Sequence, residues 1–178
     1  MNPGNVFDRM RTDHVRVLRE LATLEGTLAG LETIGKISRE VEATMRVAVE
    51  LLERQFGTHM AAEDELMFPA LERTLPHAAG QIEQLRAEHQ ELRSMLGSLG
   101  RLLGRSGDRE RDEQVVVQFH DLLDLLRIHI RKEESAVFRV AERVFEPPML
   151  QALAERMNSG AGRPPSRAPR GSSKGKRR

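Results

Sequence analysis

Six residues that could bind metal ions recur along this 178-residue sequence. They comprise two single histidines and two histidine–glutamate pairs with a spacing of four, namely His14, His59, Glu63, His89, His129 and Glu133. Residues four apart lie on one face of an α-helix, so each pair could present an imidazole and a carboxylate side by side. This combination suits Fe, Mn or Zn, fits Cu or Ni less well, and does not suit Ca, which prefers oxygen ligands.

The composition restricts the other chemistry that the chain could perform. It contains no Cys and no Tyr, which excludes thiolate ligands, disulfides, a cysteine nucleophile and a tyrosyl radical. The sequence shows no nucleophile–base pair and no phosphate-binding loop. Any enzymatic activity would therefore have to be metal chemistry.

Four long segments carry apolar residues at every third or fourth position, around residues 7–31, 41–70, 82–103 and 115–144. This period predicts amphipathic helices, and no segment alternates with the period of two that a strand requires. Helix-breaking residues separate the segments at Gly35–Lys36, Thr74–His77 and Gly104–Asp108. Short connections place successive helices antiparallel. The sequence predicts an all-α, up-down-up-down four-helix bundle.

Prolines mark two further places in this bundle. Pro147 and Pro148 close the fourth segment, and residues 149–157 could form a short fifth helix over one end. Pro69 lies inside the second segment. We expect it to kink that helix or to end it early, because proline lacks the backbone N–H.

The six candidate ligands occupy positions in the apolar stripes, where an unpaired polar group is costly to bury. Successive histidines of the set have midpoints at positions 36.5, 74 and 109, which fall on or beside the three predicted connections. Residues equidistant from a turn lie at the same height in a helical hairpin, so one histidine from each helix should meet in a single layer. Four imidazoles and two carboxylates in a dry interior suit two metal ions that share bridging carboxylates.

An internal repeat supports a two-fold arrangement. The stretches HMAAEDELMFPALE (59–72) and HIRKEESAVFRVAE (129–142) align without gaps, and an acidic residue precedes both single histidines, as Asp13 and as Glu88. The body is therefore expected to consist of two similar helical hairpins, each of which contributes one His and one His-x-x-x-Glu.

The pattern H…HxxxE…H…HxxxE resembles the hemerythrin-like, or HHE cation-binding, family over about residues 5–145. The text that follows each His-x-x-x-Glu is also similar to that family. The resemblance implies a non-haem di-iron centre in which Glu63 and Glu133 bridge the metals. Family members carry O₂, sense oxygen or iron, respond to nitric oxide, or move iron.

The sequence departs from the oxygen-carrying members of that family in two places. Those members have a fifth histidine one turn from the third-helix histidine, where this chain has Leu85 or Arg93. They also usually carry Asp at i+5 where this chain has Glu133 at i+4. The lost imidazole argues against simple reversible O₂ carriage and leaves room for an exogenous ligand. The family's iron–sulfur-repair branch carries an extra cysteine-bearing N-terminal domain that this sequence does not show, so an iron–sulfur-repair role is not expected.

Two functions follow from the resemblance. The first is a protein that binds or senses O₂, nitric oxide or peroxide at a bridged di-iron centre, with at most weak catalase- or peroxidase-like turnover. The second is an iron storage or delivery protein in which the iron is the cargo. Two Fe ions are the expected cofactors, with Mn or Zn as alternatives.

Several other polar residues are assigned to ordinary roles. We place His120 on the surface because it lies half a helical rotation from His129, and we read His77 as a loop residue. Asp13 and Glu88 are interpreted as exposed acids, with orientation of a bound imidazole as the alternative. Arg93 is read as solvated, and the phenylalanines as core packing.

The charge is unevenly distributed. Residues 159–178 hold seven of the 28 basic residues and no acid, which leaves 21 basic and 27 acidic residues in the body, a net charge of −6. We expect a bundle over residues 1–157 and a disordered basic tail over residues 158–178. A solubilising role is favoured for the tail, and nucleic-acid contact stays open. No signal peptide or membrane span is recognised, so a cytoplasmic location is expected.

Overall fold

A computed structural model of the protein describes residues 6–34 and 36–159. Every regular element in these ranges is helical, with no strand, as predicted. The elements are α1 (Val6–Ile34), α2 (Arg39–Ala62), η1 (Glu63–Met67), α3 (Phe68–Thr74), η2 (Pro76–Ala78), α4 (Ala79–Leu103), α5 (Arg109–Lys132), η3 (Glu133–Val137), α6 (Phe138–Val144) and α7 (Pro147–Asn158).

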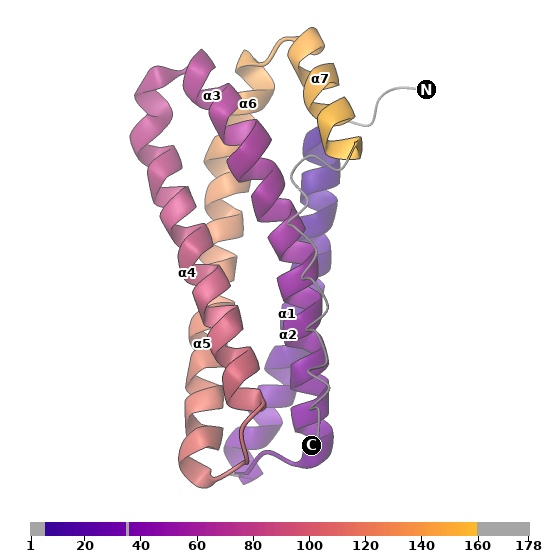
Figure 1. The fold of residues 1–178 in the computed structure, drawn as a ribbon, viewed down its shortest axis with the longest axis vertical. Helices are drawn as coiled ribbons and strands as arrows, with labels where there is room; N and C mark the ends of the chain where they lie inside the picture. The colour runs from indigo at the N-terminus through magenta and orange to yellow at the C-terminus, as the bar shows by residue number, and fades with distance from the viewer. Residues whose placement is uncertain (1–5, 35, 160–178) are drawn as a thin grey trace, which may run out of the picture.

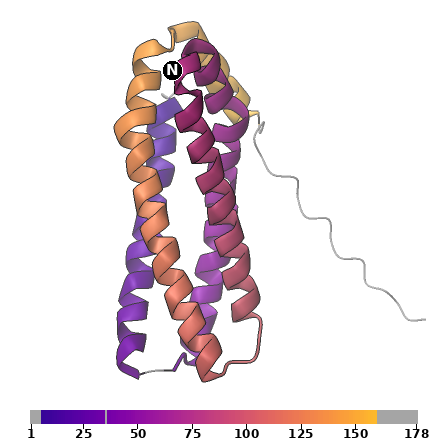
Figure 2. The same cartoon turned by 90° about the vertical axis from the view of Figure 1, so that its left-hand side faces the viewer.

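These elements form four long antiparallel rods, which confirms the predicted all-α bundle (Figure 1). One rod is α1, the second runs from α2 through η1 into α3, the third is α4, and the fourth runs from α5 through η3 into α6. Helix α1 packs on α2, α2 on α4, α4 on α5, and α5 back on α1. The rods therefore enclose a common interior along the length of the molecule (Figure 2).

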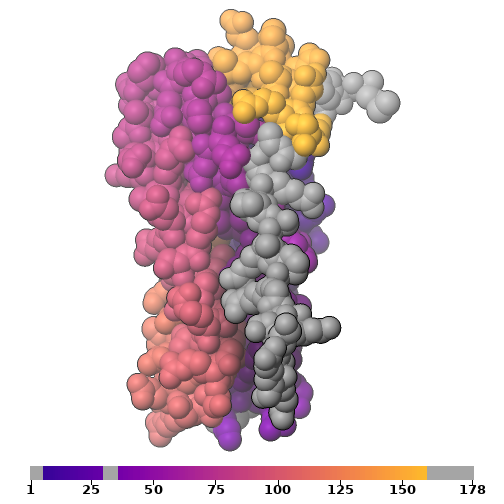
Figure 3. Space-filling view, in the orientation of Figure 1, coloured from indigo at the N-terminus to yellow at the C-terminus, as the bar shows by residue number. Residues whose placement is uncertain are grey.

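Helix α7 is the fifth helix that the sequence left room for. It packs on α1 and η1 at one end of the bundle (Figure 1; yellow in Figure 3). It begins two residues earlier than expected because proline is tolerated in the first helical turn, where the missing N–H has no partner to lose. Residues 160–178, nearly all of the predicted tail, lie outside the described residues.

The described connections use ordinary capping chemistry. The Ser38 hydroxyl accepts a hydrogen bond from the Val41 backbone N–H at 3.3 Å and begins α2. The Asp108 carboxylate accepts one from the Arg111 N–H at 2.8 Å and begins α5. Both residue types are favoured N-caps because their oxygens satisfy a free donor of the first helical turn.

The helical path passes Pro69 and stops only at Thr74, so the early end, one of the two expected effects of this proline, does not occur. Pro69 lies in the first turn of α3, directly after the π-helical turn η1. A second π turn, η3, lies at the aligned place in the other hairpin, although the residue aligned with Pro69 there is Arg139. The π turns therefore belong to the repeat and do not depend on the proline.

The apolar core is divided into two clusters. One surrounds Leu21, Leu52, Leu96 and Leu122 in the half of the bundle towards the α4–α5 connection. The other surrounds Phe7, Phe68 and Phe138 in the half that α7 covers. The six candidate ligands lie between the two clusters, so water is excluded from their layer on both sides.

A buried charged network fastens the end of the bundle opposite α7. Arg111 is 2% exposed, and its guanidinium contacts the Asp112 and Glu42 carboxylates at 2.8 Å each. Its Nε donates to the Leu102 carbonyl at 3.1 Å, and Asp112 accepts from the Ile37 backbone N–H at 3.0 Å. The network therefore links the α1–α2 connection to the end of α4.

Candidate metal centre

The structure brings the six candidate ligands into one layer of the interior. His14 lies on α1, His59 on α2, His89 on α4 and His129 on α5, and all four are at most 3% exposed. Glu63 and Glu133 are the first residues of the two π turns, and both are fully buried.

The imidazoles face each other in pairs, one pair from each hairpin. The Nε2 atoms of His14 and His59 are 2.9 Å apart, and those of His89 and His129 are 3.1 Å apart. The pairing follows from the helical hairpins, which place the two histidines of each hairpin at equal height.

Each glutamate lies closest to one histidine of each hairpin. The Glu63 carboxylate lies 3.3 Å from His59 Nε2 and 3.4 Å from His89 Nε2 through its two oxygens. The Glu133 carboxylate lies 3.0 Å from His14 Nε2 and 2.9 Å from His129 Nε2 in the same way. This is the arrangement that two bridging carboxylates would adopt between two metal ions.

The ligand atoms form two overlapping groups, each confined within 4.8 Å. Both groups contain Glu63 and Glu133; the first group adds His14 and His59, and the second adds His89 and His129. Two buried groups that share their carboxylates suit a dinuclear metal site.

The chemistry of these atoms fits a bound cation. All four carboxylate oxygens of Glu63 and Glu133 are buried without a hydrogen-bond partner, although imidazole nitrogens lie close by. Both His89 and His129 direct Nδ1 at a carboxylate, so each Nδ1 must donate. In neutral rings this leaves two Nε2 lone pairs facing each other and the glutamate oxygens. Protons or metal ions must therefore lie among these atoms.

Carboxylates from neighbouring helices hold the imidazoles of the second hairpin. Asp64 Oδ1 lies 2.8 Å from His89 Nδ1, and Glu88 Oε2 lies 2.9 Å from His129 Nδ1. Asp64 is held in turn by Arg93 at 2.8 Å, and Glu88 by an ion pair with Lys132. Such contacts fix the orientation of a metal-binding histidine and increase its basicity.

The imidazoles of the first hairpin are held less evenly. Glu134 Oε1 lies 3.0 Å from His14 Nδ1. Asp13 Oδ2 is 3.8 Å from His59 Nδ1, which has no hydrogen-bond partner. Asp13 and Glu88 are thus not simply exposed acids, because each faces a histidine on the neighbouring helix of its hairpin.

Asp64 and Glu134 were not identified from the sequence as supporting residues, although the repeat aligns them. An acid next to a ligand on an α-helix points about 100° away from it. The wider π turn reduces the angle between consecutive side chains. Glu63 and Glu133 can therefore face the centre while the following acid faces a histidine of the other hairpin.

The buried charges shift several pKa values in the direction that favours charged pairs. Although burial opposes charge, the Asp64, Glu133 and Glu63 carboxylates raise the pKa of His89 to about 10. Against the same penalty, Glu63 raises the pKa of His59, Glu133 raises that of His129, and His129 holds the pKa of Glu133 well below its usual range. In the metal-free protein, protons on the imidazoles balance the glutamates, and metal ions would displace them.

Phenylalanines hold the imidazole planes as well as packing the core. Phe138 stacks on His14 with ring centroids 5.4 Å apart, Phe68 on His89 at 5.6 Å, and Phe56 on His59 at 5.6 Å.

Three other polar residues considered in the sequence, His77, His120 and Arg93, are not among the candidate ligands. His77 and His120 are exposed, as expected, although His77 lies in the short 3-10 helix η2 and not in a loop. Arg93 is exposed, as expected, and its guanidinium also forms an ion pair with Asp64.

Residues 5–141 match the protein family described as the hemerythrin HHE cation binding domain. The match covers more than half of the chain and contains all six candidate ligands, so the chain belongs to this family. A search of curated proteins gives no match. Within the described part of the chain, no helix is long and apolar enough to cross a membrane.

Proposed function

We propose that the protein binds two iron ions in the His/Glu layer and uses the centre to bind or sense a small ligand such as O₂, nitric oxide or peroxide. One observation carries the proposal: two buried ligand groups share both of their carboxylates, and all four oxygens of those carboxylates lack a hydrogen-bond partner. Iron would supply the redox chemistry and the affinity for such ligands. Mn and Zn share the preference for imidazole and carboxylate, so the identity of the metal is part of the proposal.

The protein would contribute a rigid and nearly symmetric donor set. Glu63 and Glu133 would bridge the metals, His14 and His59 would bind one, and His89 and His129 would bind the other. Leu85 lies one turn before His89 and is 3% exposed within the apolar cluster, so it supplies no fifth imidazole. A coordination position would therefore remain for water or an exogenous ligand.

Anaerobic loading with Fe(II) tests the proposal. We expect two iron equivalents per chain and an absorption spectrum that changes when air, nitric oxide or azide is added. His59→Ala and Glu133→Ala should each abolish the binding of two equivalents. His120→Ala, a change at an exposed histidine of α5, should not.

The same preparation separates the two functions that the resemblance implies. A ligand-responsive spectrum together with slow loss of iron to a weak chelator supports ligand binding or sensing. Rapid loss of iron to that chelator, without a spectral response to any ligand, would show that iron is the cargo. Release of O₂ from hydrogen peroxide, measured with an oxygen electrode, quantifies any catalase-like turnover.

A further inference from the structure

A cavity of about 210 Å³ lies between α4 and the π turn η3, beside the second metal-binding group. Its inner wall includes Leu85 and Val137, which are 3% and 8% exposed. Its rim includes the exposed residues Gln84 and Ser135. The cavity thus runs from the surface to apolar side chains of the interior.

The inner wall of this cavity is one helical turn from the candidate ligands. Leu85 precedes His89 by four residues, and Val137 follows Glu133 by four. Glu88 also lines the cavity, and it accepts the hydrogen bond of His129 Nδ1 at 2.9 Å. None of the four ligands of the second group lines the cavity itself, but His89, His129 and Glu133 each lie one turn from, or are hydrogen-bonded to, a residue that does.

The first hairpin is closed at the equivalent place. The repeat aligns Leu66 and Met67 of the first hairpin with the smaller cavity residues Ala136 and Val137 of the second, and it aligns Met10 with Leu85, which is of similar size. The three residues of the first hairpin are at most 2% exposed, and α7 packs over α1 and η1 there. The two-fold pseudo-symmetry of the ligands is thus broken by the surrounding residues.

We propose that this cavity is the entry route for the exogenous ligand, and that the ligand binds at the metal held by His89 and His129. The inference rests on the proposed function. The short apolar side chains of the inner wall suit a small uncharged molecule such as O₂, nitric oxide or hydrogen peroxide. A water molecule occupies about 30 Å³ in the liquid, so the volume is ample for any of them.

The lining disfavours a metal ion as the occupant. A divalent cation would have to pass Leu85 and Val137, which offer it no ligand. The carboxylate of Glu88 is already engaged by His129 Nδ1 and by the Lys132 ammonium. The wall therefore holds no free anionic group to draw a cation inwards.

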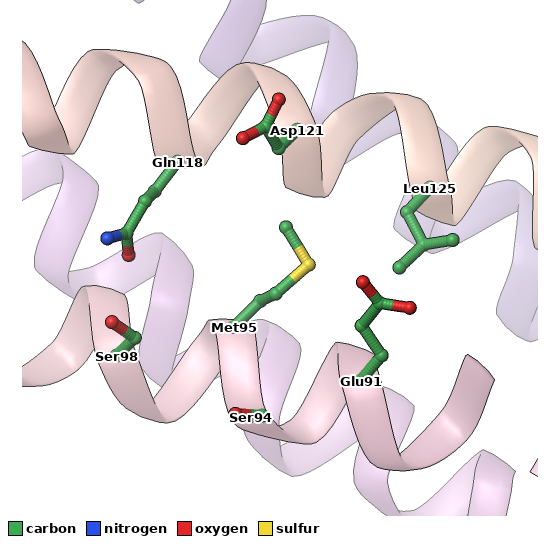
Figure 4. Close-up of a pocket in the computed structure, with 7 residues that line it drawn as sticks. All are labelled: Glu91, Ser94, Met95, Ser98, Gln118, Asp121 and Leu125. Atoms are coloured by element: carbon green, nitrogen blue, oxygen red, sulfur yellow. The ribbon is translucent and has the colours of Figure 1, made fainter. Parts of the chain in front are cut away.

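A second groove between α4 and α5 provides a matched comparison (Figure 4). It is larger, about 440 Å³, and Ser94, Met95, Gln118 and Asp121 are among the residues that line it. Its lining residues are all half-buried or exposed, and none is a candidate ligand or holds one. Filling it should leave the approach to the metals unchanged.

The test uses the Fe(II)-loaded full chain and nitric oxide in stopped-flow absorbance. Ala136→Leu introduces a leucine at the exposed rim of the cavity. The first hairpin has a leucine, Leu66, at the aligned position. We expect at least a tenfold slower association of nitric oxide, with two iron equivalents still bound. Ser94→Leu, which fills the groove of Figure 4, should bind nitric oxide at the wild-type rate.

A variant that widens the cavity should have the opposite effect on the rate of nitric oxide association. Val137→Ala should accelerate the association of nitric oxide. An increase in rate in this variant could not be explained by impaired folding, so it controls for that explanation of a slower rate in Ala136→Leu. The rate of iron loading is measured for every variant. If Ala136→Leu slows iron loading and leaves nitric oxide association unchanged, the cavity admits metal and the proposal is wrong.

Failure of this inference can be told apart from failure of the proposed function. Equal association rates in the wild type, Ala136→Leu and Val137→Ala would overturn the entry route while leaving a ligand-binding di-iron centre intact. If the iron-loaded wild type shows no response to nitric oxide at all, the proposed function and the entry route are both overturned.

Discussion

At the scale of single residues, the four imidazoles differ in how their Nδ1 atoms are held. His89 and Asp64 are 2.8 Å apart, whereas His59 and Asp13 are 3.8 Å apart. A carboxylate that accepts a hydrogen bond from a metal-bound imidazole fixes the orientation of the ring. This effect is weaker where the hydrogen bond is not formed. The supporting acids should therefore contribute unequally to metal affinity.

Asp64→Asn is expected to weaken metal binding by about 10- to 100-fold. Asp13→Asn should cause a smaller loss, because its contact with His59 is too long for a hydrogen bond. Competition with a chelator of known affinity measures both. Arg93→Gln serves as the control, since it removes the ion pair of Asp64 but keeps the carboxylate. Equal losses for the two aspartate variants would contradict this reading.

The raised histidine pKa values give the metal-free protein an unusual dependence on pH. The pKa of His89 is about 10 in the folded chain and about 6.5 in the unfolded chain. A group whose pKa is higher in the folded chain contributes its full stabilisation at pH values below its pKa in the unfolded chain. This contribution is lost as the pH rises through its pKa in the folded chain. Urea unfolding of the metal-free protein should therefore show falling stability between about pH 6.5 and pH 10.

Metal affinity should change in the opposite direction over the same range. Metal ions displace the imidazole protons, so binding tightens as the pH rises and releases protons when measured in a weak buffer. Stability of the metal-free protein that rises steadily from pH 6.5 to pH 10 would show that the imidazoles are not charged in the folded state.

At the scale of elements, the two π turns and the helix connections position the ligands. Both π turns begin at a candidate bridging glutamate, and π turns often occur at functional sites. The connections fix the height of each histidine, because a hairpin that slips by one turn would separate its pair. The Arg111 network holds the connections at the end opposite α7.

Asp112→Ala should destabilise the protein by about 3 kcal/mol, because it leaves the buried Arg111 charge and the Ile37 N–H without this partner. For a chain of this size that corresponds to a fall in Tm of about 6–12 °C. Glu113→Ala removes an exposed ion pair with Arg109 and should cost less than about 1 kcal/mol. Thermal unfolding by circular dichroism compares the two, and similar shifts would argue against a structural role for the network.

At the scale of the whole molecule, the polar layer interrupts the core between its two apolar clusters. The clusters can hold the helices together without metal, because they include large buried side chains from all four rods. Metal binding then adds stability through the layer, according to the free concentration of metal relative to the Kd.

Removal of metal by a chelator should leave the helical content nearly unchanged and lower the Tm. With free metal about 100-fold above the Kd, each bound ion contributes about 2.7 kcal/mol. Two ions would then raise the Tm by about 10–20 °C. Circular dichroism and calorimetry with and without chelator test this. Loss of helix on metal removal would show that the apolar clusters are insufficient to hold the bundle.

The sequence by itself was sufficient to predict the helical bundle and the six residues that form the polar layer. The period of three to four residues defines the helices, and the midpoints of the histidines place them at one height. Both features are local or follow from counting along the chain. For the same reason, the internal repeat was visible without a structure.

Only the tertiary structure decided which groups complete the site. The partners of Asp13, Asp64, Glu88 and Glu134 depend on how the helices are rotated about their axes, and the π turns alter that rotation without a local signal such as a proline. The packing of α7 and the cavity beside Leu85 also arise from contacts between segments far apart in the sequence. These features decide which side of a nearly symmetric metal centre is open.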